Sequence, residues 1–162
     1  MYLRLITILY LSSFSLFAQS DLPTDFLSKE FHKERRQKLR EKLPPNSVAV
    51  FFANPVRNRA NDVDFIYHQD PNFLYLTGYK EPHAVLLIFK DNQTSANGKS
   101  YDEIIFVQPR NAMREMWTGR RLGDEGTRNL LGLEQSFDNT EFKKYNVDFS
   151  KFDQVLFYDF FN

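Results

Sequence analysis

Two stretches decide the fold: residues 57–87, RNRANDVDFIYHQDPNFLYLTGYKEPHAVLL, and residues 115–123, EMWTGRRLG. The first runs from a polar segment through Asp70-Pro71 into a cluster of large apolar side chains beside Gly78, and ends in an apolar run. This order predicts a turn, a core-facing turn of helix that enters a bend, and then a buried strand. The second stretch places the only tryptophan next to two arginines, directly after a predicted helix end.

Further apolar runs predict the rest of a sheet. Continuous β-branched and aromatic residues at 48–53 indicate a strand buried on both faces, and the runs at 84–89 and 103–107 indicate two more. The polar segment 91–101 between the last two contains Asn-Gly, so we expect a hairpin and an antiparallel pair. Residues 154–160 are predicted as a final strand.

Helices are expected between these strands. Residues 25–43 contain no Gly or Pro, and their apolar side chains recur every four residues with Arg35 in the one missing slot, which predicts an amphipathic helix. These apolar residues are Leu27, Phe31, Leu39 and Leu43. The charged residues of the run, Arg36 among them, and His32 are interpreted as a solvated face.

Three shorter helices complete the pattern. We expect them at residues 112–117 and 127–131, ended by Gly119 and Gly132, and at residues 140–145, with Thr140 as N-cap and Phe142 facing inward. The economical architecture is α/β, with a mixed β-sheet flanked by helices in one domain at residues 21–162.

Composition limits the partners of this domain. The 17 Phe and 8 Tyr of the 162-residue chain can fill a core. Lys and Arg total 21, and Asp and Glu also total 21, so the chain has no bulk field for a polyanion and no nucleic-acid partner is expected.

The first 20 residues have the pattern of a secretory signal peptide. A short segment with one positive charge, Arg4, precedes an apolar run at residues 5–17, and small residues follow at Ala18 and Ser20. We predict cleavage after Ser20, with Ala18 as the second choice. Because about 20 apolar residues are needed to span a bilayer, no membrane span is expected after cleavage, and a periplasmic or secreted location follows.

Candidates for catalysis are few. The absence of Cys excludes thiol nucleophiles, and the chain has no GxSxG, HExxH or phosphate-loop motif. A carboxylate–histidine metal site can be imagined from His68 with Asp62, Asp64 and Asp70, but turn chemistry explains this segment better. His83 is explained by capping or turn polarity. No catalytic or metal-binding residue is therefore assigned.

The segment Trp117-Thr118-Gly119-Arg120-Arg121 is a candidate contact surface. Its two guanidinium groups can bind a carboxylate, and its tryptophan can close against another protein surface. A buried Trp117 beside two solvated arginines is the alternative that the sequence leaves open.

The chain resembles the N-terminal domain of Xaa-Pro aminopeptidases (aminopeptidase P), which is related to that of creatinases and prolidases. The resemblance covers residues 25–160 and is carried by the basic helix, the arginine-to-aspartate segment at 57–62, FLYLTGYKEP at 73–82, and EMWTGRRLG. It implies a ribonuclease H-like fold. By match to the family's motifs, it places Trp117, supported by Arg120 and Arg121, at the edge of a substrate site or at an oligomer contact.

The resemblance also implies an activity that we do not expect of this chain by itself. Enzymes of the family remove the residue that precedes proline at the N-terminus of Xaa-Pro peptides. They use two manganese ions held by two Asp, one His and two Glu of a C-terminal "pita-bread" domain, and none of these ligands maps onto this sequence. We therefore expect the chain alone to be inactive, with its own catalytic domain and further copies in a homo-oligomer as partners.

Two interpretations of the whole chain remain open. The sequence ends at Asn162, directly after an apolar strand, so we interpret it as a fragment from which the catalytic domain is absent; a complete small domain ending at a sheet edge is the alternative. The fragment would be part of a secreted Xaa-Pro aminopeptidase. The complete small domain would be a stand-alone, non-catalytic binding or regulatory domain. The DNA beyond the last codon discriminates between them.

Overall fold

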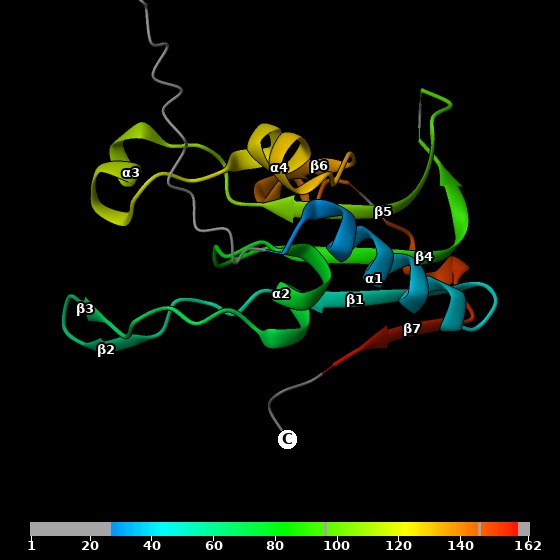
Figure 1. The fold of residues 1–162 in the computed structure, drawn as a ribbon, viewed down its shortest axis with the longest axis horizontal. Helices are drawn as coiled ribbons and strands as arrows, with labels where there is room; N and C mark the ends of the chain where they lie inside the picture. Colours follow the sequence, from blue (N-terminus) through cyan, green and yellow to red (C-terminus); the bar gives the residue numbers. More distant parts are fainter. Residues whose placement is uncertain (1–26, 96, 146, 159–162) are drawn as a thin grey trace, which may run out of the picture.

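The computed structural model describes residues 27–95, 97–145 and 147–158. Its centre is a five-stranded mixed sheet in the order β6-β5-β4-β1-β7 (Figure 1). The strands are β1 (Ser47–Phe52), β4 (Val85–Thr94), β5 (Ser100–Val107), β6 (Ser136–Asp138) and β7 (Gln154–Phe157). β1, β4 and β5 are joined antiparallel, while β6 and β7 pair parallel to β5 and β1 at the two edges. The predicted mixed α/β architecture is confirmed.

The central strands are buried from both sides, as predicted for β1. Val48 and Val50 belong to the core on one face, and Ala49 between them belongs to the core on the other face. The predicted hairpin between β4 and β5 is also confirmed, with Gly98 in the left-handed region of its turn. A strand that is apolar at every position therefore needs cover on both faces.

Helices cover one face and aromatic rings the other. The helical layer contains α1 (Lys29–Lys42), α2 (Pro71–Thr77) and α4 (Gly123–Leu131), which contribute Leu39, Leu76 and Leu131 to one core. On the opposite face, Phe106 of β5 lies 5.1 Å from Phe142, measured between ring centroids. Other rings from β6 and the segment after it pack there too: Phe137, Tyr145, Phe149 and Phe152.

The inward face of α1 differs from the prediction. Leu27 lies before the helix and is exposed, whereas His32 and Arg36 are the buried residues of α1. His32 Nδ1 lies 2.8 Å from the Tyr75 carbonyl oxygen, and Arg36 donates to both carboxylate oxygens of Glu103 at 2.7 and 2.9 Å. The expectation that His32 and Arg36 are solvated is wrong because each finds a polar partner inside the fold.

The predicted helical turn after Asp70 is confirmed as α2. Asp70 is its N-cap and accepts from the Phe73 N–H at 2.7 Å, while Gly78 ends the helix in the left-handed conformation with φ 71°. Phe73 and Tyr79 are fully buried, so the aromatic stretch fixes this helix onto the sheet.

The segment after β6 corrects another prediction. In place of a helix at residues 140–145 there is a single 3₁₀ turn, η1 (Asn139–Glu141), whose N-cap is Asp138 and not Thr140. A second turn, η2 (Phe149–Lys151), follows. The predicted inward position of Phe142 is correct, since its ring packs on Phe106. Packing of rings onto the sheet takes precedence over helix formation in this short segment.

Other boundaries shift or lie outside the description. α3 (Ala112–Thr118) ends at Gly119 and α4 ends at Gly132, as predicted, but α4 begins four residues earlier than expected. The signal peptide predicted at residues 1–20, residues 25 and 26 of the first predicted helix, and the end of the last predicted strand lie outside the described residues. Within the described ranges, no helix is long and apolar enough to cross a bilayer.

Candidate functional site

The tryptophan of the second diagnostic stretch lies on a helix that projects from the end of the sheet. No residue of α3 is buried, and the side chain of Trp117 is 87% exposed. Met113 and Met116 on the same helix are also largely exposed. The alternative of a buried Trp117 is therefore wrong. Three exposed side chains of this size and polarity form a surface that suits protein or peptide contact.

The two arginines lie beside this helix and in different environments. Arg120 is exposed, and within the described ranges its side chain has no hydrogen-bond or ion-pair partner. Arg121 is half-buried, with Nη1 3.5 Å from the Pro109 carbonyl oxygen. Both line a hollow of about 640 Å³ that Asp124 and Glu125 also line. Trp117 does not line this hollow, so the structure brings the arginines together and leaves the tryptophan separate.

Glu115 organises the base of α3. Its carboxylate accepts two hydrogen bonds from Arg110, at 2.7 and 2.8 Å, and one from the Asn111 N–H at 2.9 Å. These donors, chiefly the Arg110 guanidinium, lower the pKa of Glu115 to about 2. The same pair raises the pKa of Arg110. The ion pair is therefore charged throughout the neutral pH range.

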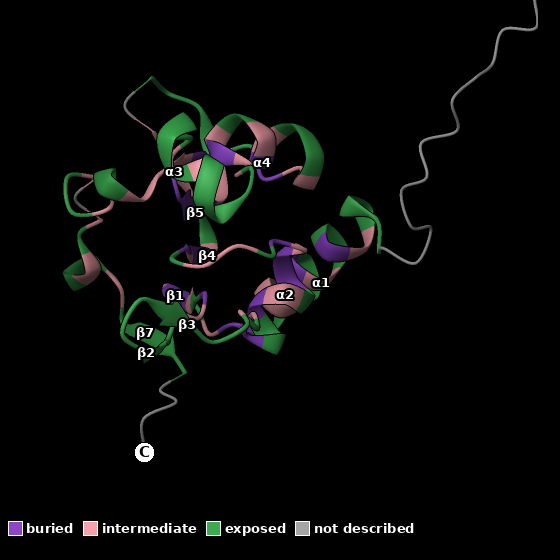
Figure 2. Cartoon of the chain, turned by 90° about the vertical axis from the view of Figure 1, so that its left-hand side faces the viewer, coloured by how far each residue is buried: buried purple, intermediate pink, exposed green. Residues whose placement is uncertain are grey.

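A second projection lies at the same end of the molecule. The short hairpin of β2 (Asn58–Ala60) and β3 (Val63–Asp64) extends beyond the sheet on the same side as α3 (Figure 1). Viewed onto that end, both projections carry exposed surface (Figure 2). Ile66, directly after the hairpin, is 85% exposed. Two projections that carry exposed apolar side chains therefore share one end of the fold.

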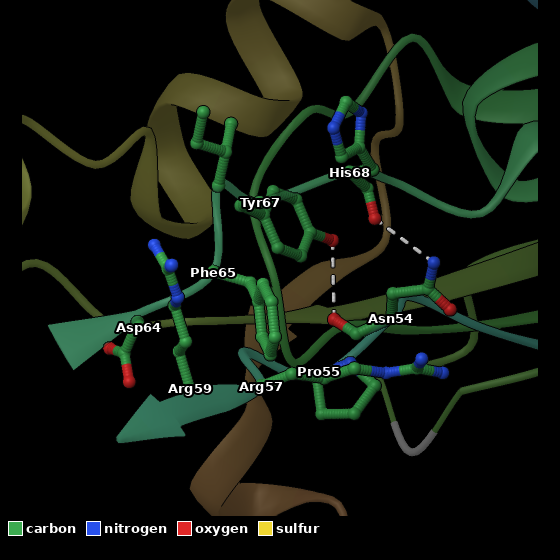
Figure 3. Close-up of a pocket in the computed structure, with 9 residues that line it drawn as sticks. Asn54, Pro55, Arg57, Arg59, Asp64, Phe65, Tyr67 and His68 are labelled. Atoms are coloured by element: carbon green, nitrogen blue, oxygen red, sulfur yellow. Dashed lines mark hydrogen bonds between the residues drawn. The ribbon is translucent and has the colours of Figure 1, made fainter. Parts of the chain in front are cut away.

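The hairpin borders a hollow of about 530 Å³ that the sequence did not reveal. Figure 3 shows the ring of Phe65 in its middle, with the guanidinium of Arg59 on one side and that of Arg57 on the other. The Tyr67 hydroxyl donates to the Asn54 carbonyl oxygen at 3.2 Å, and burial raises the pKa of Tyr67 to about 12. The isolated apolar pair Phe65-Ile66 within a polar stretch was the available signal.

The metal site considered around His68 does not form. Asp70 is turned into α2 as its cap, and Asp64 accepts from the Asn58 amide at 3.2 Å. His68 is exposed at the hollow beside the hairpin. In the part of the chain that the structure describes, no three His, Cys, Asp or Glu side chains gather in a group that could hold a metal ion.

Comparisons with known proteins place this geometry in a family. The family model of the aminopeptidase P N-terminal domain matches residues 32–156. The Xaa-Pro aminopeptidase of Haemophilus influenzae is 37% identical over 116 residues, which cover 72% of this chain and 26% of that protein. The Xaa-Pro aminopeptidase of Escherichia coli is 34% identical over 115 residues, which cover 71% of this chain and 25% of that protein.

Solved structures agree with the sequence comparisons. The structure of aminopeptidase P from E. coli with the inhibitor Pro-Leu superposes with a TM-score of 0.72 and 30% identity, covering 84% of this chain and 30% of that chain. Pseudomonas aeruginosa aminopeptidase PepP gives a TM-score of 0.71 at 29% identity. The chain spans about a quarter of the length of the Xaa-Pro aminopeptidases of H. influenzae and E. coli. Because the family model matches most of the chain and the fold agrees, the chain belongs to the aminopeptidase P N-terminal domain family.

Proposed function

We propose that this chain is the non-catalytic N-terminal domain of a secreted, manganese-dependent Xaa-Pro aminopeptidase. In this role it packs against a catalytic domain, supports a homo-oligomer and contributes Trp117 to the edge of a substrate site. The observation that carries the proposal is the 87% exposure of Trp117 on a helix that projects from the fold. Tryptophan and arginine are the residues whose removal most often costs binding energy at protein interfaces.

The chemistry of the projecting end suits an Xaa-Pro peptide or the rim of the pocket that holds one. A proline residue has no backbone N–H and presents a rigid apolar ring, so its recognition depends on ring contact more than on backbone pairing. The indole of Trp117 offers a flat apolar surface for such contact. Arg120, whose side chain has no partner within the described residues, can donate to a peptide carbonyl or carboxylate oxygen.

The hydrolytic step is assigned to another domain. The donors around His68 do not fit a metal, since Asp70 caps a helix and Asp64 is held by Asn58. We therefore place the two manganese ions in a separate catalytic domain, where they would activate the water that attacks the peptide bond. This chain supplies contact surface, and we expect it to be inactive when purified alone.

Export is the second part of the proposal. Residues 1–20 have the sequence pattern of a signal peptide, and the mature protein would begin at Asp21 in a periplasmic or secreted location. Expression in a bacterium that exports the protein, followed by N-terminal sequencing of the periplasmic fraction, tests this directly. An intact N-terminus starting at Met1 on cytoplasmic protein would contradict export.

The proposed inactivity is tested with the purified mature chain. Incubated with Mn²⁺ and an Xaa-Pro peptide, it is expected to release no free amino acid, while a complete Xaa-Pro aminopeptidase under the same conditions releases the residue before proline. Release by the chain itself, abolished by a chelator, would contradict the assignment. A chain that is inactive and also fails to support turnover when joined to a catalytic domain would indicate a stand-alone binding or regulatory domain.

A further inference from the structure

The helix that carries Trp117 lacks the packing that normally holds a helix in place. α3 has seven residues, none of them buried, and it projects from the sheet on two connecting segments (Figure 1). Isolated helices of this length are unstable in water. Its geometry must therefore come from contacts at its base.

Arg110 joins the two connecting segments of residues 110–123, which we call the Trp117 loop. Its guanidinium donates to both oxygens of Glu115 inside the loop. Its aliphatic stem lies across Gly123, where an added Cβ would stand 2.7 Å from Arg110 Cγ. Gly123 is buried with φ +65°, so the return segment passes directly against this stem. A side chain at the start of the loop thus contacts both its helix and its end.

Glu81 ties the end of the loop to the core. Its Oε1 accepts from the Leu122 N–H at 2.7 Å, and its Oε2 accepts from the Tyr79 hydroxyl at 3.0 Å. Tyr79 is fully buried, and burial beside this carboxylate raises its pKa. The hydrogen bonds connect the first diagnostic stretch to the second across 41 residues of sequence.

We infer that Arg110, Glu115 and Glu81 are positioning residues that hold the Trp117 loop in one conformation before any partner or peptide binds. What Trp117 then contacts rests on the proposed function; the order of the loop does not. A loop that is already ordered loses less conformational entropy on docking, which raises affinity without any new contact. The bidentate geometry makes Arg110 irreplaceable by Lys, whose ammonium offers no planar fork.

The test uses the fluorescence of the chain's only tryptophan. In the full chain, Trp117 is expected to lose its anisotropy mainly with the tumbling of the whole domain. In Arg110→Ala, the part of the anisotropy that decays through local motion on the nanosecond scale should be at least about twice as large as in the unsubstituted chain. Hydrogen exchange at residues 112–118 should accelerate as well, whereas the unfolding midpoint followed by far-UV circular dichroism should hardly move.

Matched variants decide the outcome. Arg114 lies on the same helix, and its side chain has no partner within the described residues. Arg114→Ala should therefore leave the anisotropy unchanged. Arg110→Lys should loosen the loop almost as much as Arg110→Ala. If Arg110→Ala does not fold, Glu115→Gln and Glu81→Ala provide the same readout. Unchanged anisotropy in the folded variants would overturn the inference, whereas a loosened loop with no docking function for Trp117 would overturn only the proposed function.

Discussion

At the scale of single residues, the ion pair between Arg36 and Glu103 is the clearest stabilising feature. Arg36 is 1% exposed and also donates to the Leu76 carbonyl oxygen at 2.8 Å. Arg36→Ala leaves Glu103 without its cation, and we expect a loss of about 3 kcal/mol in the free energy of unfolding measured with urea. The double variant Arg36→Met with Glu103→Leu should regain most of this loss. Equal losses in the single and double variants would contradict the pairing argument.

The Glu115 carboxylate predicts a pH dependence. Its pKa in the folded protein is about 2, below the ordinary 4.5, so folding favours the ionised form. The contribution of this carboxylate to the stability of the folded state is therefore complete above about pH 4.5 and is lost as the pH falls towards 2. We expect the Trp117 loop to be more ordered in the natural chain than in Glu115→Gln at pH 6, with the difference shrinking over this window. A difference that stays constant from pH 6 to pH 2 would show that the charge has no role.

Arg36 and Trp117 show why burial is hard to predict from sequence. Arg36 lies on a helix rich in charges, where a solvated face is the reasonable expectation. Its partner Glu103 follows 67 residues later, and only the folded sheet brings the two together. Trp117 posed the opposite problem, because no local pattern distinguishes an exposed tryptophan from a buried one; the family's motifs pointed to it before any geometry was known.

At the scale of elements, the N-cap of α2 supports the aromatic stretch that the resemblance rests on. Asp70 is buried and its Oδ1 accepts from the Phe73 N–H. Asp70→Ala removes this acceptor and should lower the free energy of unfolding by about 1–2 kcal/mol. Asp70→Ser keeps a capping oxygen and should lose less. If urea unfolding shows the same loss for both, the cap is not the source of the effect.

The other end of α2 gives a second prediction. Gly78 has φ +71°, and an added Cβ would stand 2.8 Å from His32 Nε2. Gly78→Ala should therefore cost more than the roughly 1–2 kcal/mol of backbone strain alone. The same substitution in a His32→Ala chain should cost less, because the clash is removed. Equal costs in both chains, measured by urea unfolding, would show that His32 does not limit this position.

Elements with a clear apolar run or end signal were predictable, and the shortest strands were not. β1, β4 and β5 have apolar runs long enough to identify from sequence, and Gly119 and Gly132 end their helices as expected. β2, β3 and β6 contain two or three residues each, too few to show a periodic pattern. Their pairing is decided by neighbouring strands and turns, which a local pattern does not contain.

At the scale of the whole molecule, one end differs from the rest. The chain has no net charge, yet the end formed by α3 and the β2–β3 hairpin carries Arg57, Arg59, Arg114 and Arg120, none with a side-chain partner within the described residues, against the two hairpin carboxylates of Asp62 and Asp64. Exposed apolar side chains lie among these cations, Trp117 and Ile66 foremost. We expect this end to meet a surface that is partly acidic, so that association weakens as salt is added.

The central claim is that Trp117 makes a functional contact in a complete enzyme. It is tested most directly in a chimera in which residues 27–158 replace the matching part of the E. coli Xaa-Pro aminopeptidase, by measuring kcat/KM on an Xaa-Pro peptide and the sedimentation of the oligomer. Loss of an interface anchor costs about 2 kcal/mol or more, which is roughly thirtyfold, so Trp117→Ala should lower kcat/KM by about that factor or dissociate the oligomer. Leu27→Ala, which trims an exposed apolar side chain before α1, should change neither. Unchanged kinetics together with unchanged oligomer size in Trp117→Ala would contradict the claim.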